Sequence, residues 1–367
     1  MTPQLEIIIT ACIVSTACVI PGVFLILRRV ALMSDAISHA ILMGIVIMFF
    51  IVKDLHSPLL MIGAVATGIL TVLLTEWIIQ SKRLKEDAAI GLVFPVFFSI
   101  GVILISRYAG NIHLDQDAVL LGEIAFAPFN RFLFLGRDLG PVAMWSMGAI
   151  LVMNLGLLLL FYKELKLATF DKALAATVGF SPVLLYYGLM TTVSITAVGA
   201  FDAVGSILVV ALMITPPSTA YLLTDRLSRM IVLSVLIGIA SAVSGYVMAS
   251  LLDASIAGSI ATMTGAAFLI ALFFSPKQGL LTTYLRSKHQ KTDFASKMLL
   301  VQLMVHEDQQ EDFETTVTHM VHHMDWSIKF SKKIARYSVE KGYITRNQDQ
   351  LFLTPLGREV ARAAIVH

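Results

Sequence analysis

The chain has 367 residues, of which 57% are hydrophobic and 14% charged, and its mean hydropathy is +0.81. Soluble domains carry about 25% charged residues, so this composition excludes a soluble enzyme, a disordered tail and a disulfide-framed secreted module. The apolar excess predicts that most of the chain faces lipid. The formal charge of +2 is unevenly spread, because the last quarter holds nearly half of the basic residues. We therefore expect a membrane domain over residues 1–276 and a soluble domain over residues 277–367.

Apolar runs that are long enough to cross a bilayer recur along the predicted membrane domain. A hydrocarbon core of about 30 Å requires about 20 apolar residues per helix. The predicted spans are 5–27, 31–52, 58–79, 88–106, 141–162, 182–201, 203–223, 229–252 and 256–275. The sixth and seventh runs almost merge, so we expect eight or nine spans. The segment 118–135 is only partly apolar and is interpreted as re-entrant or interfacial.

Basic residues mark every second loop between these spans. They are Arg28, Arg29, Lys82, Arg83, Lys85, Lys163, Lys166, Lys172, Arg226, Arg229 and Lys277. The positive-inside rule places these loops in the cytoplasm, so the N-terminus is expected outside and the C-terminus inside. The first run lacks a basic leader and is interpreted as a retained helix, not as a signal peptide.

Two ionisable residues, Asp35 and His39, lie inside the second predicted span. Their spacing of four places both side chains on one face of a helix. A carboxylate in hydrocarbon costs at least ~3 kcal/mol, so we expect it to have a use. A carboxylate oxygen and an imidazole nitrogen form half of a divalent metal site that suits manganese, zinc or iron. The alternative is that the pair, flanked by Ser34 and Ser38, only makes hydrogen bonds near a helix end.

The loop after the fifth apolar run contains a helix-capping pattern. Asp171 is a suitable N-cap for a short helix over 172–178, and Gly179 is a suitable C-cap. A short helix on the cytoplasmic face suits the docking of a partner, and an ordinary interhelical loop fits the pattern equally well.

The chain contains no Gly-x-x-x-x-Gly-Lys-[Ser/Thr] motif. We therefore do not expect an enzyme, and an ATP-driven mechanism would need a separate nucleotide-binding subunit.

Ordered motifs over residues 5–276 resemble those of the permeases of manganese, zinc and iron ABC importers. They are the Asp-x-x-x-His pattern in Ser34–Ala40, and the segments Glu86–Phe94, Phe170–Gly179 and Gly205–Pro217. The resemblance implies an all-α polytopic permease of the ABC importer type II-like class in the bacterial cytoplasmic (inner) membrane. It also implies that Asp35 and His39 bind the metal in the membrane. The ATPase-coupling residues that it implies are Phe170, Asp171, Lys172, Ala175 and Gly179.

The same resemblance implies a set of partners. Two ABC ATPase subunits would dock beneath two permeases, the second being an identical copy or a paralogue, and an extracellular solute-binding protein would deliver the ion. Two Asp and two His side chains from such a pair would close a four-ligand site. Apart from membrane lipid and the transported manganese, zinc or iron, no permanently bound cofactor is expected. A proton- or ion-coupled carrier that needs no ATPase is a further alternative.

The pattern after Pro276 changes to that of a soluble domain. Helical periodicity covers 294–306 and 313–323, a further helix follows, two strands are predicted over 343–346 and 351–354, and a last helix begins at Pro355. This arrangement resembles the winged-helix domains that are fused to some permeases of this family and found in metal-dependent repressors. We therefore expect a small α+β, winged-helix-like domain in the cytoplasm.

Two groups of side chains suggest roles for this domain. Three histidines spaced i, i+3 and i+4 predict a regulatory metal site, with a solvated helix face as the alternative; they are His319, His322 and His323. Four basic residues share the next helix: Lys329, Lys332, Lys333 and Arg336. Their charge leaves a membrane-anchored metal sensor or transcription regulator as the alternative function. Because a membrane-tethered tail has poor access to DNA, we expect no nucleic-acid partner and prefer a regulatory or dimerising role.

Overall fold

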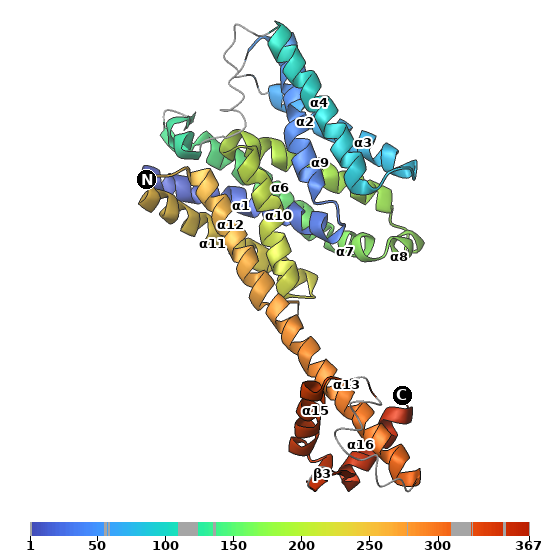
Figure 1. The fold of residues 1–367 in the computed structure, drawn as a ribbon. Coiled ribbons are helices and arrows are strands. Elements are labelled where there is room, and N and C mark those ends of the chain that lie inside the picture. The colour runs from blue at the N-terminus through green and yellow to red at the C-terminus, as the bar shows by residue number, and fades with distance from the viewer. Residues whose placement is uncertain are drawn as a thin grey trace. The chain divides into compact units, whose positions relative to one another are not determined.

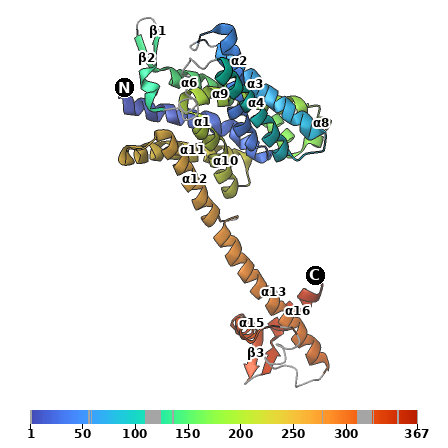
Figure 2. The ribbon, with the colours of Figure 1, turned by 45° about the horizontal axis from the view of Figure 1, so that its top comes forward.

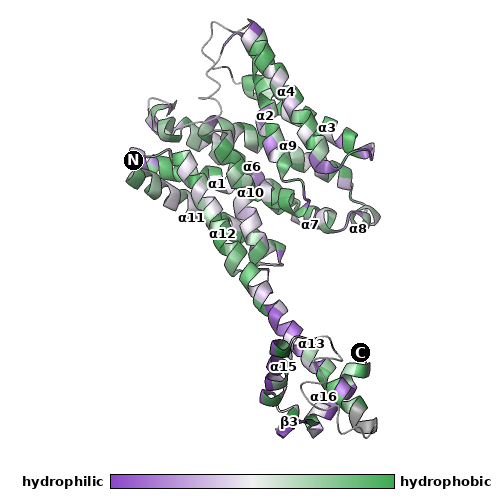
Figure 3. Cartoon of the chain, viewed as in Figure 1, coloured by the Kyte–Doolittle hydropathy of each residue, from purple (hydrophilic) through white to green (hydrophobic). Residues whose placement is uncertain are grey.

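The computed structural model describes residues 2–54, 57, 59–108, 124–134, 137–276, 278–309, 324, 326–347 and 350–366. The chain forms two compact units, Met1–Gln278 and Gly279–His367, each with its own buried apolar cluster (Figure 1). Most of the helical residues in the first unit are hydrophobic, whereas the helices of the second unit include hydrophilic stretches (Figure 3).

Long apolar helices joined by short turns build the first unit. They are α1 (Pro3–Leu27), α2 (Leu32–Val52), α3 (Leu59–Gln80), α4 (Glu86–Tyr108), α6 (Val142–Leu160), α7 (Tyr162–Phe170), α8 (Lys172–Thr177), α9 (Pro182–Val204), α10 (Ser206–Leu223), α11 (Leu227–Leu252) and α12 (Ile256–Phe274). In the described part of the chain, nine of them are long and apolar enough to cross a membrane, as predicted. A single residue, Gly205, separates α9 from α10 and adopts a φ of 79°, which explains why the two apolar runs almost merge in the sequence.

Helix α1 lies at the centre of the first unit and packs against α6, α9, α10 and α11. Helices α2, α3 and α4 form a second group, which α9 joins to the first (Figure 2). The crossing of α2 and α3 is close because both helices have a glycine there. A Cβ atom added at Gly44 would lie 2.3 Å from the carbonyl oxygen of Gly63. Only glycine therefore allows this approach, which fixes the position of α2.

A buried polar contact ties α1 to α6 and α9. Pro21 has no N–H group, so the carbonyl of Ala17 lacks its usual helical hydrogen bond. Asn154 of α6 donates from Nδ2 to the Ala17 oxygen at 2.9 Å and to Oγ1 of Thr196 at 3.0 Å. Asn154 and Thr196 are fully buried. The contact satisfies polar atoms that would be costly to leave unpaired among apolar helices.

A hairpin stands between α4 and α6. It follows the 3₁₀ helix η1 (Ile124–Phe129) and pairs β1 (Arg131–Phe134) with β2 (Arg137–Pro141). The sequence predicted a re-entrant or interfacial segment over 118–135 and missed these strands. Residues 109–123 lie outside the described part of the chain.

Arg131 holds this hairpin against α1. Its Nη1 and Nη2 donate to the buried carboxylate of Glu6 at 3.0 and 3.2 Å, and its Nε donates to Asp138 of β2. The hydrogen bond with Asp138 raises the pKa of Arg131 and, from the other side, lowers the pKa of Asp138. The hairpin thus lies beside the first turn of α1 (Figure 2).

The second unit combines three helices with a two-stranded sheet. Its elements are α13 (Leu280–Gln309), α15 (Ile328–Glu340), β3 (Ile344–Asn347), β4 (Gln350–Leu353) and α16 (Pro355–Val366). The strands pair antiparallel with Ile344 opposite Leu353, close to the two strands predicted. Leu300 of α13 and Ile334 of α15 are both fully buried in its core.

Two predictions for this unit lie outside the described residues. They concern the helix over 313–323 and the candidate regulatory ligands His319, His322 and His323. The winged-helix assignment itself stays a prediction. The basic residues of α15 at 329, 332, 333 and 336 are exposed along one side of that helix.

Candidate functional site

Helix α2 positions the predicted ligand pair near its beginning. Asp35 lies in the first turn of the helix, where free N–H groups and the helix dipole favour a negative side chain. Met33, Ile37 and Ile41 are fully buried and hold the opposite face against the core. This packing leaves Asp35 and His39 on the less crowded face of α2.

Asp35 and His39 contact each other directly. His39 Nε2 lies 3.3 Å from Asp35 Oδ1, and their side chains are 31% and 37% exposed, with His39 the less exposed of the two. The structure therefore brings the two predicted ligands together on one face. Ser34 and Ser38 donate instead to backbone oxygens of Ala31 and Ser34 at 2.9 and 2.8 Å. Their hydroxyls thus bond to the helix backbone and not to the pair.

Two aromatic side chains of α4 enclose the imidazole of His39. The ring centroid of Phe94 lies 5.7 Å from that of His39, and Phe98 lies 5.9 Å away with its ring nearly perpendicular. Phe97, the residue before Phe98 on α4, is buried in a cluster with Ala40 of α2. Sequence reasoning missed this enclosure, because the four-residue spacing of Phe94 and Phe98 does not show which helix they face.

The pair offers one carboxylate and one imidazole. Among the described residues, no cluster of three or more His, Cys, Asp or Glu side chains has metal-binding geometry. A divalent transition ion takes four to six donors in N/O sites. An ion held by Asp35 and His39 would take its remaining ligands from water or from another chain.

The predicted docking segment forms a capped helix, α8. The Asp171 carboxylate accepts a hydrogen bond from the Leu174 N–H at 2.9 Å, which is the expected N-cap. Gly179 has a φ of 97°, its N–H bonds to the Ala176 oxygen, and the Phe180 N–H bonds to the Ala175 oxygen. This pattern is a Schellman C-cap, which requires the left-handed conformation that glycine adopts without strain.

The other residues of this segment differ in exposure. Phe170 is 61% exposed and Lys172 is exposed, whereas Ala175 is fully buried. Helix α7, which precedes α8, was not predicted, because its nine residues are too few and too polar to resemble a span. An exposed aromatic at the junction of α7 and α8 gives this loop a surface on which a partner can pack.

These features define a polytopic helical membrane protein that carries a carboxylate–imidazole pair in one span and a capped helix between two others. The chain belongs to the ABC 3 transport family, whose pattern matches residues 4–275. The match ends just before the second unit begins.

Relatives of known name match the first unit, and one of them matches nearly the whole chain. The zinc transport system membrane protein TroD of Treponema pallidum is 46% identical over 362 residues, which cover 98% of each chain. The manganese transport system membrane protein MntD of Bacillus subtilis is 46% identical over 295 residues, which cover 80% of this chain and 100% of MntD. The solved structure of PsaBC from Streptococcus pneumoniae in complex with Fab is 31% identical, covers 78% of this chain and 96% of that chain, and has a TM-score of 0.64.

Proposed function

We propose that this chain is the membrane-spanning permease subunit of an ATP-driven importer of a divalent transition metal, namely manganese, zinc or iron. Membership of the ABC 3 transport family and the names of TroD and MntD support this function. The observation that carries it is the contact between Asp35 and His39 on a partly exposed face of an apolar helix. A membrane helix retains two such side chains at a cost, and a passing cation provides the compensating interaction.

The metal site would be completed by a second permease. Asp35 supplies a hard oxygen and His39 a borderline nitrogen, and this donor set suits Mn²⁺, Zn²⁺ and Fe²⁺. A second copy or a paralogue would add the same two ligands across the path between the subunits. The ion is cargo, so it must bind strongly enough to lose part of its water shell and weakly enough to leave.

Movement of the ion would be coupled to ATP hydrolysis through α8. The capped helix over residues 171–179 presents Phe170, Asp171 and Lys172 to a separate ATPase subunit. In this arrangement ATP-driven motion of the ATPase moves α8, and α9 and the other spans follow. An extracellular solute-binding protein would supply the ion on the other side.

The second unit would be a cytoplasmic, winged-helix-like domain with a regulatory or dimerising role. Family membership supports a location in the bacterial inner membrane, and the positive-inside pattern supports a C-terminus in the cytoplasm. TroD and MntD are both named as transport proteins, so neither favours the alternative of a membrane-anchored sensor or transcription regulator.

Metal uptake by ligand variants tests the proposal. Asp35→Asn and His39→Ala should each abolish uptake of manganese, zinc and iron, measured by elemental analysis of cells that also express the ATPase and the solute-binding protein. Asp202→Asn is the matched control, since it makes the same change in the last turn of α9 and should leave uptake near the parent level. Membrane abundance is checked by immunoblot. Normal uptake by Asp35→Asn and His39→Ala would refute the assigned site.

A further inference from the structure

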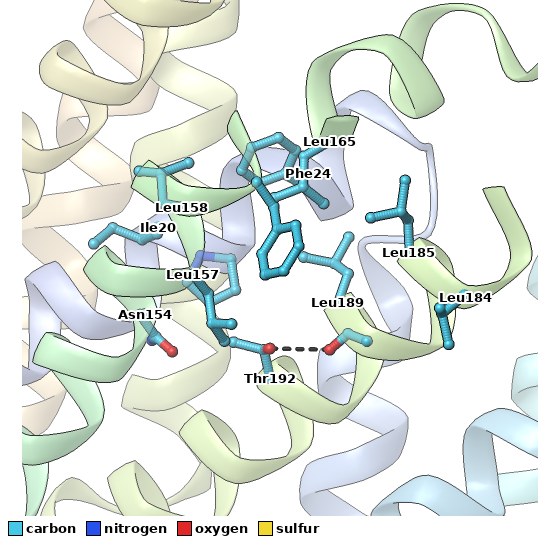
Figure 4. A pocket seen from close by; sticks show the side chains of 13 residues that line it. Ile20, Phe24, Asn154, Leu157, Leu158, Leu165, Leu184, Leu185, Leu189 and Thr192 are labelled. Atoms are coloured by element: carbon cyan, nitrogen blue, oxygen red, sulfur yellow. Dashed lines mark hydrogen bonds between the residues drawn. The ribbon is translucent and has the colours of Figure 1, made fainter. Parts of the chain in front are cut away.

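An apolar cavity lies between α1, α6, α7 and α9 of the first unit, away from Asp35 and His39. Its volume is about 240 Å³. Figure 4 shows Phe24, Leu157 and Leu189 directed toward the same space. The lining residues are Ile20, Pro21, Phe24, Asn154, Leu157, Leu158, Phe161, Leu165, Leu184, Leu185, Gly188, Leu189 and Thr192.

The polar groups of this lining are already satisfied. Asn154 donates to Ala17 and Thr196, as described above, and Thr192 Oγ1 donates to the Gly188 oxygen at 2.9 Å (Figure 4). Water in a cavity needs two to four polar partners, and apolar cavities of about 150 Å³ stay dry and bind hydrocarbons. The cavity is therefore suited to a hydrocarbon ligand.

The position of the cavity along the helices places it in one leaflet. It is lined by the last turns of α1 and α6 and by the first turns of α9. These three ends lie on the same side of the membrane domain. Leu184 and Leu157 at its rim are 72% and 37% exposed. At this depth the surrounding medium is the acyl region of the bilayer, so the hydrocarbon available to fill the cavity is a lipid chain.

A cation lies one helical turn beyond the cavity. Arg28 follows Phe24 by four residues on α1, and its Nε donates to Oγ1 of Thr169 on α7 at 3.3 Å. The guanidinium carbon lies 5.6 Å from the ring centroid of Tyr186 on α9. Among the described residues, Arg28 Nη2 is buried without a hydrogen-bond partner. The helices α1, α7 and α9 thus carry the apolar lining and, at their membrane-water end, a partly exposed cation.

We propose that this cavity binds an acyl chain of an anionic phospholipid whose phosphate lies beside Arg28. The apolar lining accepts the chain, and the guanidinium favours a headgroup of net negative charge over a zwitterionic one. Leu165 lines the cavity and belongs to α7, so the bound acyl chain contacts α7, which leads directly into α8. The lipid therefore packs against the segment that connects the spans to α8 and stabilises it in the position seen here.

Filling the cavity tests the acyl-chain part of the proposal. A Cβ at Gly188 meets no atom within 4 Å, so Gly188→Leu places a side chain in the cavity without a backbone clash. Gly156→Leu is the matched control, because Gly156 of α6 is equally open and does not line the cavity. The purified chain is incubated with palmitoyl-oleoyl phosphatidylglycerol and examined by native mass spectrometry. Gly188→Leu should weaken lipid binding about tenfold, while Gly156→Leu should bind like the parent.

The headgroup part of the proposal is tested separately. The parent should retain phosphatidylglycerol in preference to phosphatidylcholine with the same acyl chains, and Arg28→Gln should remove that preference. This comparison does not depend on the folding of Gly188→Leu. Equal binding of the two lipids by the parent would overturn the headgroup assignment, as would a preference that Arg28→Gln keeps. Equal lipid binding by Gly188→Leu and Gly156→Leu, or occupation of the cavity by a helix of a second copy in cross-linked samples, would overturn the cavity assignment.

Discussion

His39 depends on a different helix, α4, for the orientation of its ring. Phe94 and Phe98 contact the imidazole from two directions, which restricts rotation about its Cβ–Cγ bond. A ligand that is already oriented loses less entropy when it binds an ion. Both phenylalanines are therefore positioning residues for the proposed site.

Phe98→Leu should weaken metal transport without altering the fold. Aromatic pairs are worth about 0.5–1.5 kcal/mol beyond their buried area, so we expect about a three- to tenfold rise in the metal concentration for half-maximal uptake. Phe98→Tyr keeps the ring and should restore the parent value. Phe97→Leu removes a ring that packs against Ala40 of α2, so it controls for a general loss of packing between α2 and α4. Identical uptake curves for Phe98→Leu and the parent would show that the ring does not orient His39.

The pair itself could be predicted from the sequence, and its surroundings could not. Asp35 and His39 are four residues apart in one apolar run, so helical geometry alone places them together. Their enclosure depends on the packing of α4 against α2, which involves residues about 60 positions apart. The contact of Asn154 with Ala17 is of the same kind. Helical geometry shows that Pro21 leaves the Ala17 carbonyl unpaired, but only the three-dimensional packing shows that Asn154 satisfies it.

Helix α8 is capped by Asp171 at its beginning and by Gly179 at its end, so a change of either cap tests its proposed coupling role. Removal of an N-cap costs about 1 kcal/mol, and a six-residue helix has little else to hold it. Asp171→Ala should therefore fray α8 and lower the amount of metal imported per ATP hydrolysed by the assembled transporter. Asp171→Asn keeps a side-chain oxygen at the cap and should behave like the parent. An unchanged coupling ratio in Asp171→Ala would argue against docking of the ATPase at α8.

The hairpin between α4 and α6 should respond to acid. Its ion pair with Arg131 lowers the pKa of Asp138, so the pair stabilises the hairpin at pH values above the ordinary range of an aspartate. That contribution is lost as the pH falls through the lowered pKa. Hydrogen-exchange protection of residues 131–141, corrected for the intrinsic exchange rate, should therefore decline toward pH 3. In Asp138→Asn the protection should be lower at neutral pH and should change less over this range.

The membrane-spanning helices could be predicted from the sequence, because the length of an apolar run decides whether it can cross a bilayer. Nine apolar runs became nine helices of the described chain, because a bilayer-spanning run allows few alternatives. Helix α7 and the β1–β2 hairpin were missed for a different reason. Helix α7 and each strand of the hairpin have fewer than ten residues of mixed polar and apolar type. Contacts with α9 stabilise α7, and the ion pair with α1 stabilises the hairpin. The hairpin in particular is fixed by Arg131 and the distant Glu6.

At the scale of the whole molecule, the change from apolar to charged sequence near Pro276 coincides with the division into two compact units after Gln278. The family match stops at residue 275, and MntD matches over its whole length with 295 residues. TroD, in contrast, matches 98% of this chain and so extends through the second unit. The first unit is therefore the part of this chain that TroD and MntD both match.

Removal of the second unit should separate transport from its regulation. A chain that ends at Gln278 retains Asp35, His39 and α8, so it should still import metal at low external concentration. It should lose the decrease in uptake that we expect when cytoplasmic metal rises, because the unit that would sense the metal is gone. Uptake is measured in whole-cell assays at low and high cytoplasmic metal.

A full-length variant with alanine at His319, His322 and His323 is the matched comparison. If these histidines bind cytoplasmic metal, the triple variant should lose the inhibition as the truncated chain does while the second unit stays in place. Persistent inhibition in the triple variant together with its loss on truncation would assign the response to other residues of the second unit. If truncation leaves the inhibition intact, the second unit has no regulatory role in transport.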